Sequence, residues 1–200
     1  MANKGKQPVA SKGAHMFGKI ASMVNVPPSE QSYSLLMDEI NNDSVKGVIE
    51  WIIEANFAEQ KPSHLTLLVC SYGGVLSSAF ALIDIMKGSS IPISTVALGD
   101  VASAGTLIVM SGEKGKRFCT TNTTFMSHQY TAGAMGKHHE LVSVMKDFTI
   151  TDAKIVAHYK KCTGLDEKQI RKVLLPPTDV YLTPPEAKKY GIIDHVKDLN

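Results

Sequence analysis

Residues 65–70 constrain the fold most, because they are apolar at every position except Thr66. A strand with both faces buried has this composition, whereas a strand with one face in water alternates apolar and polar residues. The run ends at Ser71-Tyr72-Gly73-Gly74, and a helical pattern follows over about residues 75–86. Because such a strand needs cover on both faces, the segment predicts an α/β fold with a parallel sheet.

The alternation of strand and helix continues on both sides of this segment. A strand is predicted at residues 93–98, followed by a turn at Ser103 and a helix to about Met110. Upstream, residues 33–37 predict a strand, and Ser44 can cap a helix. The buried stripe of that helix comprises apolar residues spaced three and four apart, namely Val45, Val48, Ile49, Ile52, Ile53 and Phe57. Strand–helix–strand units at this spacing indicate right-handed crossovers and a mainly parallel sheet.

The second half of the chain is predicted from shorter signals. Short strands are expected at residues 117–119 and 125–128, and a long helix over about residues 136–163, with Gly164 at its end. A last strand is predicted at Ile192-Ile193-Asp194. Together these elements form one domain over residues 33–200.

Composition separates this domain from the N-terminus and excludes several classes of protein. The chain has 200 residues, 44% of them hydrophobic, with a net charge of +2, so no nucleic-acid partner is indicated. No apolar run reaches membrane-spanning length, and three scattered cysteines suit a reducing compartment, which predicts a cytoplasmic protein. Residues 1–32 are rich in lysine and small residues and are expected to form a mobile or loosely attached arm; its apolar residues, Met16, Phe17, Ile20 and Met23, could instead dock on a partner.

Three loci are predicted to lie at the carboxyl ends of strands, where reactive groups collect in open α/β sheets. They are Gly73-Gly74, Ser103 and His128. Ser103 precedes a helix, whose free N–H groups favour a developing oxyanion. Each locus alone also fits a plain structural role, as a tight turn, close packing or a hydrogen-bonded histidine, and Asp179 alone fits a turn or a cap. No cysteine or histidine spacing matches a metal site, so no metal is expected.

Taken together, six motifs in order resemble the proteolytic subunit of the Clp protease (ClpP) family, from about Tyr33 to the C-terminus. They are residues 71–74 (SYGG), 99–105 (GDVASAG), 115–118 (GKRF), 126–129 (MSHQ), 179–187 (DVYLTPPEA) and 190–194 (YGIID). The resemblance implies the ClpP/crotonase-like fold, a spiral of repeated β/α units with a protruding long helix.

The resemblance also implies the site. Ser103 would be the nucleophile, His128 the general base and Asp179 the residue that orients the imidazole. The backbone N–H groups of Gly73 and Ala104 would form the oxyanion hole. No cofactor is implied, because ATP is used only by a partner.

In the family, the long helix, here about residues 136–163, stacks two seven-membered rings into a closed chamber of fourteen subunits. A Clp-type AAA+ ATPase feeds this chamber with unfolded polypeptides, which bind as an added strand. The resemblance therefore implies a serine endopeptidase that associates with itself and with such an ATPase, but not with nucleic acid or membrane. The N-terminal arm could line the pore.

Three positions depart from the family pattern. Tyr72 and Tyr130 replace prolines beside the expected substrate groove, and Thr178 replaces an arginine that pairs across the ring interface. Peptide preference and ring stacking are the properties these changes affect.

Two alternatives remain open from the sequence: a non-catalytic ring subunit that modulates an active partner, and a crotonase-like acyl-CoA enzyme.

Overall fold

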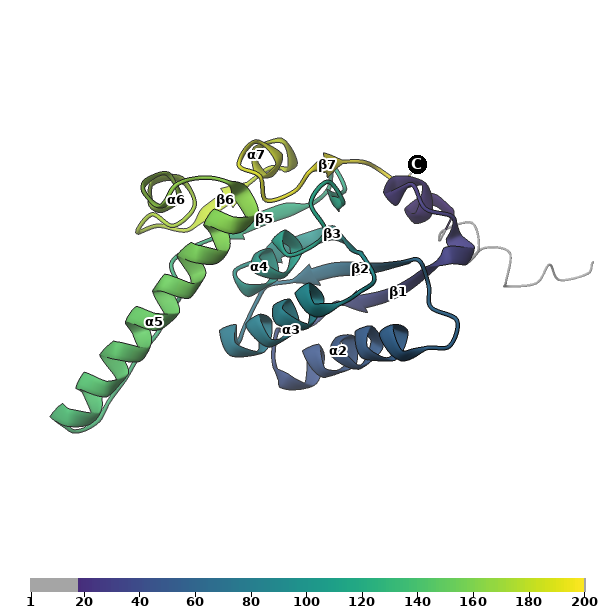
Figure 1. Cartoon of the computed structure of the whole chain (residues 1–200). Helices are drawn as coiled ribbons and strands as arrows, with labels where there is room; N and C mark the ends of the chain where they lie inside the picture. Colours follow the sequence, from purple (N-terminus) through teal and green to yellow (C-terminus); the bar gives the residue numbers. More distant parts are fainter. Residues whose placement is uncertain (1–17, 200) are drawn as a thin grey trace, which may run out of the picture.

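The protein is described by a computed structural model covering residues 18–199, in which one seven-stranded sheet carries the fold (Figure 1). The strands are β1 (Gln31–Leu36), β2 (His64–Ser71), β3 (Ile93–Ala102), β4 (Arg117–Cys119), β5 (Thr124–Ser127), β6 (Val180–Leu182) and β7 (His195–Val196). The helices are α2 (Asn42–Phe57), α3 (Leu76–Gly88), α4 (Ala104–Met110), α5 (His138–Thr163), α6 (Glu167–Val173) and α7 (Pro184–Lys189), with a short 3-10 helix, η1 (Pro28–Glu30).

The sheet is parallel at every strand pair except one. Its main path runs β1-β2-β3-β4-β7, and β5 pairs with β3 off this path. Only the pairing of β5 with β6 is antiparallel among the described strands. The predicted α/β fold with a mainly parallel sheet is therefore confirmed.

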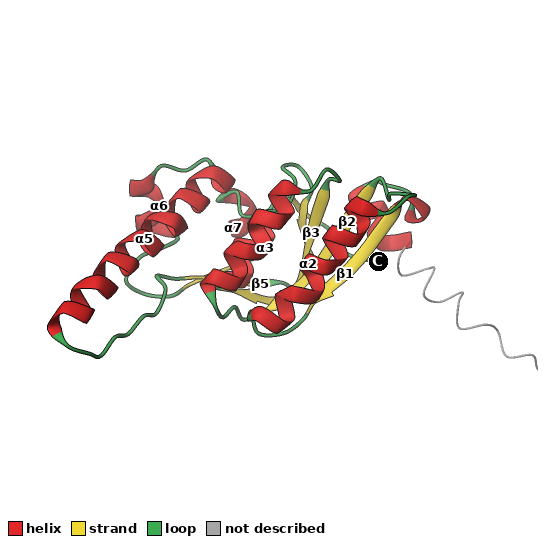
Figure 2. Ribbon diagram, turned by 60° about the horizontal axis from the view of Figure 1, so that its bottom comes forward, coloured by secondary structure: helices red, strands yellow, loops and turns green. Residues whose placement is uncertain are grey.

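Strand β2 is covered on both faces, as its composition predicts. Because side chains alternate along a strand, Leu67 joins the main core while Leu68 packs into a second cluster on the opposite face. Helices α2 and α3 lie side by side over the first face (Figure 2). The second face is covered by Ile20 and Met23, from a helical stretch at residues 18–24.

The N-terminal arm predicted for residues 1–32 is therefore described only in part. Ile20 and Met23, considered above as a surface for a partner, are 2% and 3% exposed in this chain's own second cluster. Met16 and Phe17 lie outside the described residues, as does the rest of the arm before residue 18. The boundary at residue 32 stays a prediction.

Strand β3 changes its partner halfway along its length. Its first part, through Ala97, pairs with β4, whereas its last part, Asp100 to Ala102, pairs with β5. Gly99 lies at the change with φ +57°, a conformation that glycine adopts without steric cost, and the β2–β3 register shifts beside it. This bend brings β5 next to the end of β3, where Ser103 follows.

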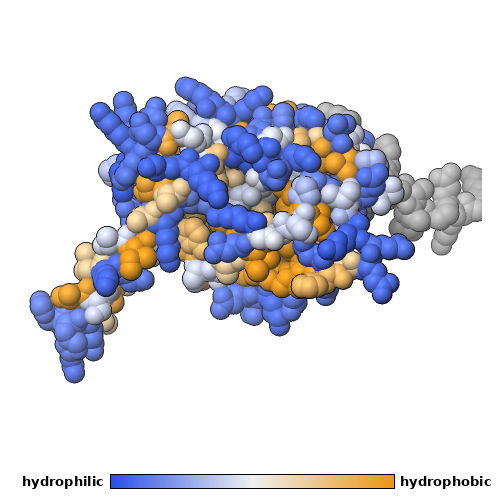
Figure 3. All heavy atoms as spheres, viewed as in Figure 1, coloured by the Kyte–Doolittle hydropathy of each residue, from blue (hydrophilic) through white to orange (hydrophobic). Residues whose placement is uncertain are grey.

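Helix α5 projects away from the body of the molecule (Figure 1). Its buried residues, Ile155, Val156, His158 and Tyr159, all lie in its C-terminal half. Its N-terminal half exposes Val142, Met145 and Ile150, and apolar atoms are visible along the projecting helix (Figure 3). Gly164 ends the helix at φ +81°, as predicted. Within residues 18–199, no helix is long and apolar enough to cross a membrane.

Two local predictions are wrong. The last strand is His195–Val196 rather than Ile192–Asp194, because the Ile192 N–H still donates to the Ala187 carbonyl at the end of α7, and pairing with β4 begins only at His195. Helix α2 begins at Asn42, one turn earlier than Ser44 suggests. Asn41 is its N-cap, and the Ser44 hydroxyl binds back to the Asn41 N–H at 3.0 Å.

The predicted buried stripe of α2 is also too wide. Ile53 and Phe57 are 42% and 85% exposed, whereas Val45, Val48 and Ile52 are buried. Helical spacing identifies the side on which residues lie, but the width of the contact with the sheet decides which of them are covered.

Candidate active site

Ser103 occupies a strained turn between β3 and α4. Its φ and ψ are +53° and −121°, a conformation that residues with a side chain rarely adopt. Backbone strain of this kind persists only where surrounding structure enforces it. Here the Ser103 N–H donates to the Met126 carbonyl at 2.9 Å, and Ala102 pairs with Met126 in the sheet. The turn presents the Ser103 side chain at the carboxyl end of β3.

His128 reaches Ser103 because of the β3–β5 register. Ala102 lies opposite Met126, so the residues that follow the two strands emerge at the same edge of the sheet. The distance between His128 Nε2 and Ser103 Oγ is 2.8 Å, which is a hydrogen bond. The sequence prediction that these two residues lie together at strand ends agrees with this geometry.

Asp179 approaches the other side of the imidazole through the β5–β6 register. Ser127 lies opposite Val180 in that antiparallel pair, so the next residues outward, His128 and Asp179, are neighbours. The distance from His128 Nδ1 to Asp179 Oδ1 is 3.6 Å, longer than a hydrogen bond. The side chains are 20% and 54% exposed. The carboxylate is placed to attract a charged imidazole while remaining in contact with water.

Gly73 lies against the same serine. A Cβ built at Gly73 would lie 2.7 Å from Ser103 Cβ and 3.0 Å from the Ala104 nitrogen, and Gly73 has φ +99°. Only glycine fits there. The Ala104 N–H is in the first turn of α4, where the helix offers it no acceptor. The Gly73 N–H donates to Ser71 Oγ at 3.2 Å, a long bond within its own turn.

A small cavity adjoins Ser103 and His128. Its volume is about 10 Å³, and its other lining residues are apolar or aromatic: Leu76, Leu107, Tyr130, Ile155 and Tyr159. From the sequence, Tyr130 is placed beside the expected substrate groove, and the other four are not assigned to the site. Their common signal is weak, since Leu107, Ile155 and Tyr159 read as ordinary core positions of helices. Only Tyr130, as a departure from a family pattern, drew attention to this place.

Metal chemistry has no candidate ligand set in the described part of the chain. Among residues 18–199, no group of three or more His, Cys, Asp or Glu side chains could hold a metal ion. The pair His138-His139 lies exposed in the first turn of α5.

Comparison with known proteins identifies the family. The family model described as Clp protease matches residues 29–200. The chain belongs to the Clp protease family. A similar protein is "ATP-dependent Clp protease proteolytic subunit 3, chloroplastic" from Arabidopsis thaliana, 36% identical over 141 residues. That alignment covers 70% of this chain and 45% of the relative, so the chain spans less than half of the length of that relative.

Membership of the Clp protease family agrees with the fold described above, a parallel sheet with a long projecting helix. It also favours a protease subunit over the acyl-CoA enzyme left open by the sequence. The matched region begins at residue 29, close to the predicted domain start at residue 33.

Proposed function

We propose that this chain is a serine endopeptidase, the proteolytic subunit of an ATP-dependent protease, with Ser103 as nucleophile. The observation that carries the proposal is the 2.8 Å contact between His128 Nε2 and Ser103 Oγ at a strained strand-to-helix turn. A nucleophile and a base within hydrogen-bond reach, with a third group behind the base, define this class of catalysis by geometry.

In the proposed reaction, His128 Nε2 removes the hydroxyl proton as Ser103 Oγ attacks the carbonyl carbon of a peptide bond. The imidazolium then gives that proton to the departing amine, and an acyl group stays on Ser103. Water, activated by the same nitrogen, releases the acyl group and restores the serine. Asp179 stabilises the imidazolium, whose Nδ1–H faces the carboxylate.

Ala104 and Gly73 are the proposed donors to the oxyanion. The Ala104 N–H is available at the start of α4, and Gly73 lies against both Ser103 and the Ala104 nitrogen. The weak 3.2 Å bond from the Gly73 N–H to Ser71 Oγ must give way for that N–H to reach substrate. Loss of one such donor costs about a hundred- to a thousandfold in rate.

Membership of the Clp protease family supports a proposal about assembly and partners. The exposed apolar residues Val142, Met145 and Ile150 on α5 suit a helix that packs against another subunit, as stacking of heptameric rings requires. Thr178, in place of the pairing arginine, is exposed beside Asp179. We propose ring assembly with a Clp-type ATPase that supplies unfolded polypeptide. The similar Arabidopsis protein is named as chloroplastic, and a cytoplasmic location for this chain stays a prediction.

Ser103→Ala tests the proposal. The full chain is treated with an alkyl fluorophosphonate, and labelled peptides are mapped by mass spectrometry while hydrolysis of short peptides is followed. The wild-type protein is expected to be labelled at Ser103, and the variant is expected to lose both labelling and hydrolysis. Ser111→Ala is the matched control, since Ser111 lies at the other end of α4. Undiminished labelling of Ser103→Ala would overturn the assignment.

One observation favours a second candidate, the non-catalytic ring subunit. The 3.6 Å gap between His128 Nδ1 and Asp179 Oδ1 leaves the imidazole without a hydrogen bond to that carboxylate. Correctly assembled rings of this chain that neither hydrolyse peptides nor take up the fluorophosphonate would support this second function.

A further inference from the structure

If Ser103 attacks a peptide bond as proposed above, the cavity beside Ser103 is the adjoining space for a substrate side chain next to the scissile bond. At about 10 Å³ it has room for about one water molecule. It touches both Ser103 and His128, and the walls beyond them are apolar or aromatic. Such a cavity takes an apolar side chain and limits its size.

Three of the side chains that line the cavity are fixed by packing in the core. Leu107 on α4 and Ile155 and Tyr159 on α5 are 3%, 5% and 2% exposed, and all belong to the main core. The Tyr159 hydroxyl lies 2.6 Å from Ser127 Oγ, which also donates to the Leu174 carbonyl. Since protein cores are closely packed, moving these side chains would disturb α4 and α5 themselves.

Tyr130 is a wall of a different kind, because it lies on the loop between β5 and α5 and is half-buried. Its hydroxyl donates to the Phe148 carbonyl at 2.9 Å. Its ring meets the Phe148 ring edge to face, with centroids 6.4 Å apart and planes at 73°. Two contacts to one residue of α5 therefore hold the ring at the cavity. Burial raises the pKa of the Tyr130 hydroxyl, so it stays protonated and able to donate.

We propose that Tyr130 determines substrate specificity by closing this cavity, so that Ser103 cleaves after small residues such as alanine in preference to large ones. The inference rests on the proposed peptidase function. When the Tyr130 ring leaves, which breaks its contacts with Phe148, the cavity opens to a large side chain. Size exclusion of this kind discriminates by about ten- to two-hundredfold for a change as small as one methylene.

The test measures how fast Ser103 reacts with two peptidyl diphenyl phosphonates that differ only in the side chain next to phosphorus, alanine in one and phenylalanine in the other. An alkyl fluorophosphonate without a peptide measures the reactivity of the serine itself. The full-length wild-type protein is expected to react about tenfold or more faster with the alanine reagent. In Tyr130→Ala, this ratio is expected to fall at least about tenfold.

Two further variants distinguish the effect of the Tyr130 ring from that of its hydroxyl and from the general effect of removing a tyrosine. Tyr130→Phe keeps the ring and is expected to keep the preference for alanine. Tyr181→Ala removes a ring that is 67% exposed on β6, outside the cavity lining, and is expected to leave the ratio at its wild-type value.

The outcomes distinguish the two proposals. If the fluorophosphonate labels Ser103 but the wild-type protein accepts both phosphonates equally, or Tyr130→Ala does not change the ratio, the specificity assignment is wrong and the peptidase assignment stands. If nothing labels Ser103, both are wrong. An equal wild-type ratio overturns the specificity assignment even if Tyr130→Ala fails to fold.

Discussion

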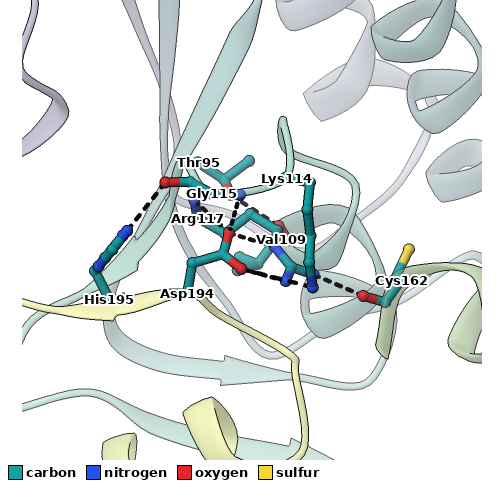
Figure 4. Close-up of polar contacts among 8 residues, drawn as sticks. All are labelled: Thr95, Val109, Lys114, Gly115, Arg117, Cys162, Asp194 and His195. Carbon is teal, nitrogen blue, oxygen red and sulfur yellow. Dashed lines mark hydrogen bonds and ion pairs between the residues drawn. The ribbon is translucent and has the colours of Figure 1, made fainter. Parts of the chain in front are cut away.

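Two charged clusters lie at opposite ends of the sheet, and each joins a central strand to a carboxylate from the C-terminal part of the chain. At the start of β4, Arg117 binds Asp194; at the end of β5, His128 faces Asp179. The first cluster is closed (Figure 4). Arg117 Nη2 and Nε donate to Asp194 Oδ1 and Oδ2 at 2.6 Å and 2.8 Å, and the side chains are only 1% and 12% exposed.

The second cluster is open. Its imidazole and carboxylate are 3.6 Å apart and 20% and 54% exposed. Asp194 also accepts from the backbone N–H groups of Gly115 and Arg117, and Arg117 Nη1 donates to the Cys162 carbonyl at 3.1 Å. Every polar atom of the Arg117–Asp194 cluster thus has a hydrogen-bond partner. The His128–Asp179 pair is accessible to solvent, so it can exchange protons and contact a substrate. We infer that the Arg117–Asp194 cluster stabilises the fold, whereas the His128–Asp179 cluster takes part in catalysis.

If this division is right, the largest effect on activity comes from His128→Ala. Without the imidazole, Ser103 has no base, and kcat for peptide hydrolysis is expected to fall by about 10⁴-fold or more. The midpoint of thermal unfolding is expected to change little, because His128 is partly exposed. His139→Ala, at an exposed histidine of α5, is the control for losing a histidine. Retention of most of the activity in His128→Ala would contradict the division.

Arg117→Leu is expected to have the opposite profile. It removes the buried cation of Asp194 and leaves only the exposed Lys114, whose Nζ lies 3.7 Å from Asp194 Oδ1. Breaking a buried pair costs about 3–5 kcal/mol of unfolding free energy, measured with urea. Arg171→Leu is the matched control. Arg171 pairs with Asp152 and Glu167 at 2.7 Å and 2.9 Å but is 42% exposed, so its loss is expected to cost under about 1 kcal/mol. Equal costs for the two variants would remove the distinction between a buried and an exposed arginine.

Asp179→Asn sharpens the description of the open cluster. The carboxylate supports the imidazolium through a longer, partly hydrated contact, so kcat is expected to fall by less than the roughly 10⁴-fold loss typical of a hydrogen-bonded triad aspartate, and by less than for His128→Ala. Unfolding free energy is expected to stay within about 0.5 kcal/mol of wild type, as for most surface substitutions. A loss of kcat as large as that of His128→Ala would instead mean that the 3.6 Å gap closes when substrate binds.

Local features of the sequence predicted the elements of the fold, whereas the proximity of the site residues depends on contacts between distant strands. The parallel sheet follows from the composition of β2, and a long helix follows from the apolar period that Gly164 ends, but that this helix projects was implied only by the family resemblance. The candidate residues Ser103, His128 and Asp179 were identifiable because their motifs resemble a family. Their proximity depends on two strand registers, Ala102 opposite Met126 and Ser127 opposite Val180, which local sequence does not specify.

Tertiary contacts also decided where prediction failed. The apolar pair Ile192-Ile193 predicts a strand, but the Ile192 N–H binds the end of α7, and the chain meets β4 through Asp194, whose partner Arg117 is 77 residues away. Periodicity contains no information about such a pair. Tyr130 likewise becomes a cavity wall only through Phe148, and the helix that carries Phe148 is placed by its far end in the core.

The smallest expected effect is the change in unfolding free energy at acid pH, which depends on Asp194. Burial raises the pKa of Asp194, but the hydrogen bonds and charge of Arg117, with the backbone N–H groups of Arg117 and Gly115, outweigh burial and hold it below its usual value. A carboxylate whose pKa is lower in the folded than in the unfolded state contributes stability that is complete above the unfolded pKa, about 3.9, and disappears as the pH falls through the folded value.

The stability advantage of wild type over Asp194→Asn is therefore expected to be constant from pH 7 to about pH 5 and to shrink below about pH 4. Urea unfolding at each pH measures it. Asp147→Asn, at an exposed carboxylate of α5, controls for the loss of one negative charge. If the difference in unfolding free energy between wild type and Asp194→Asn grew toward acid pH, Asp194 would be easier to protonate in the folded than in the unfolded protein. The ionised carboxylate of the closed cluster would then destabilise the fold at neutral pH.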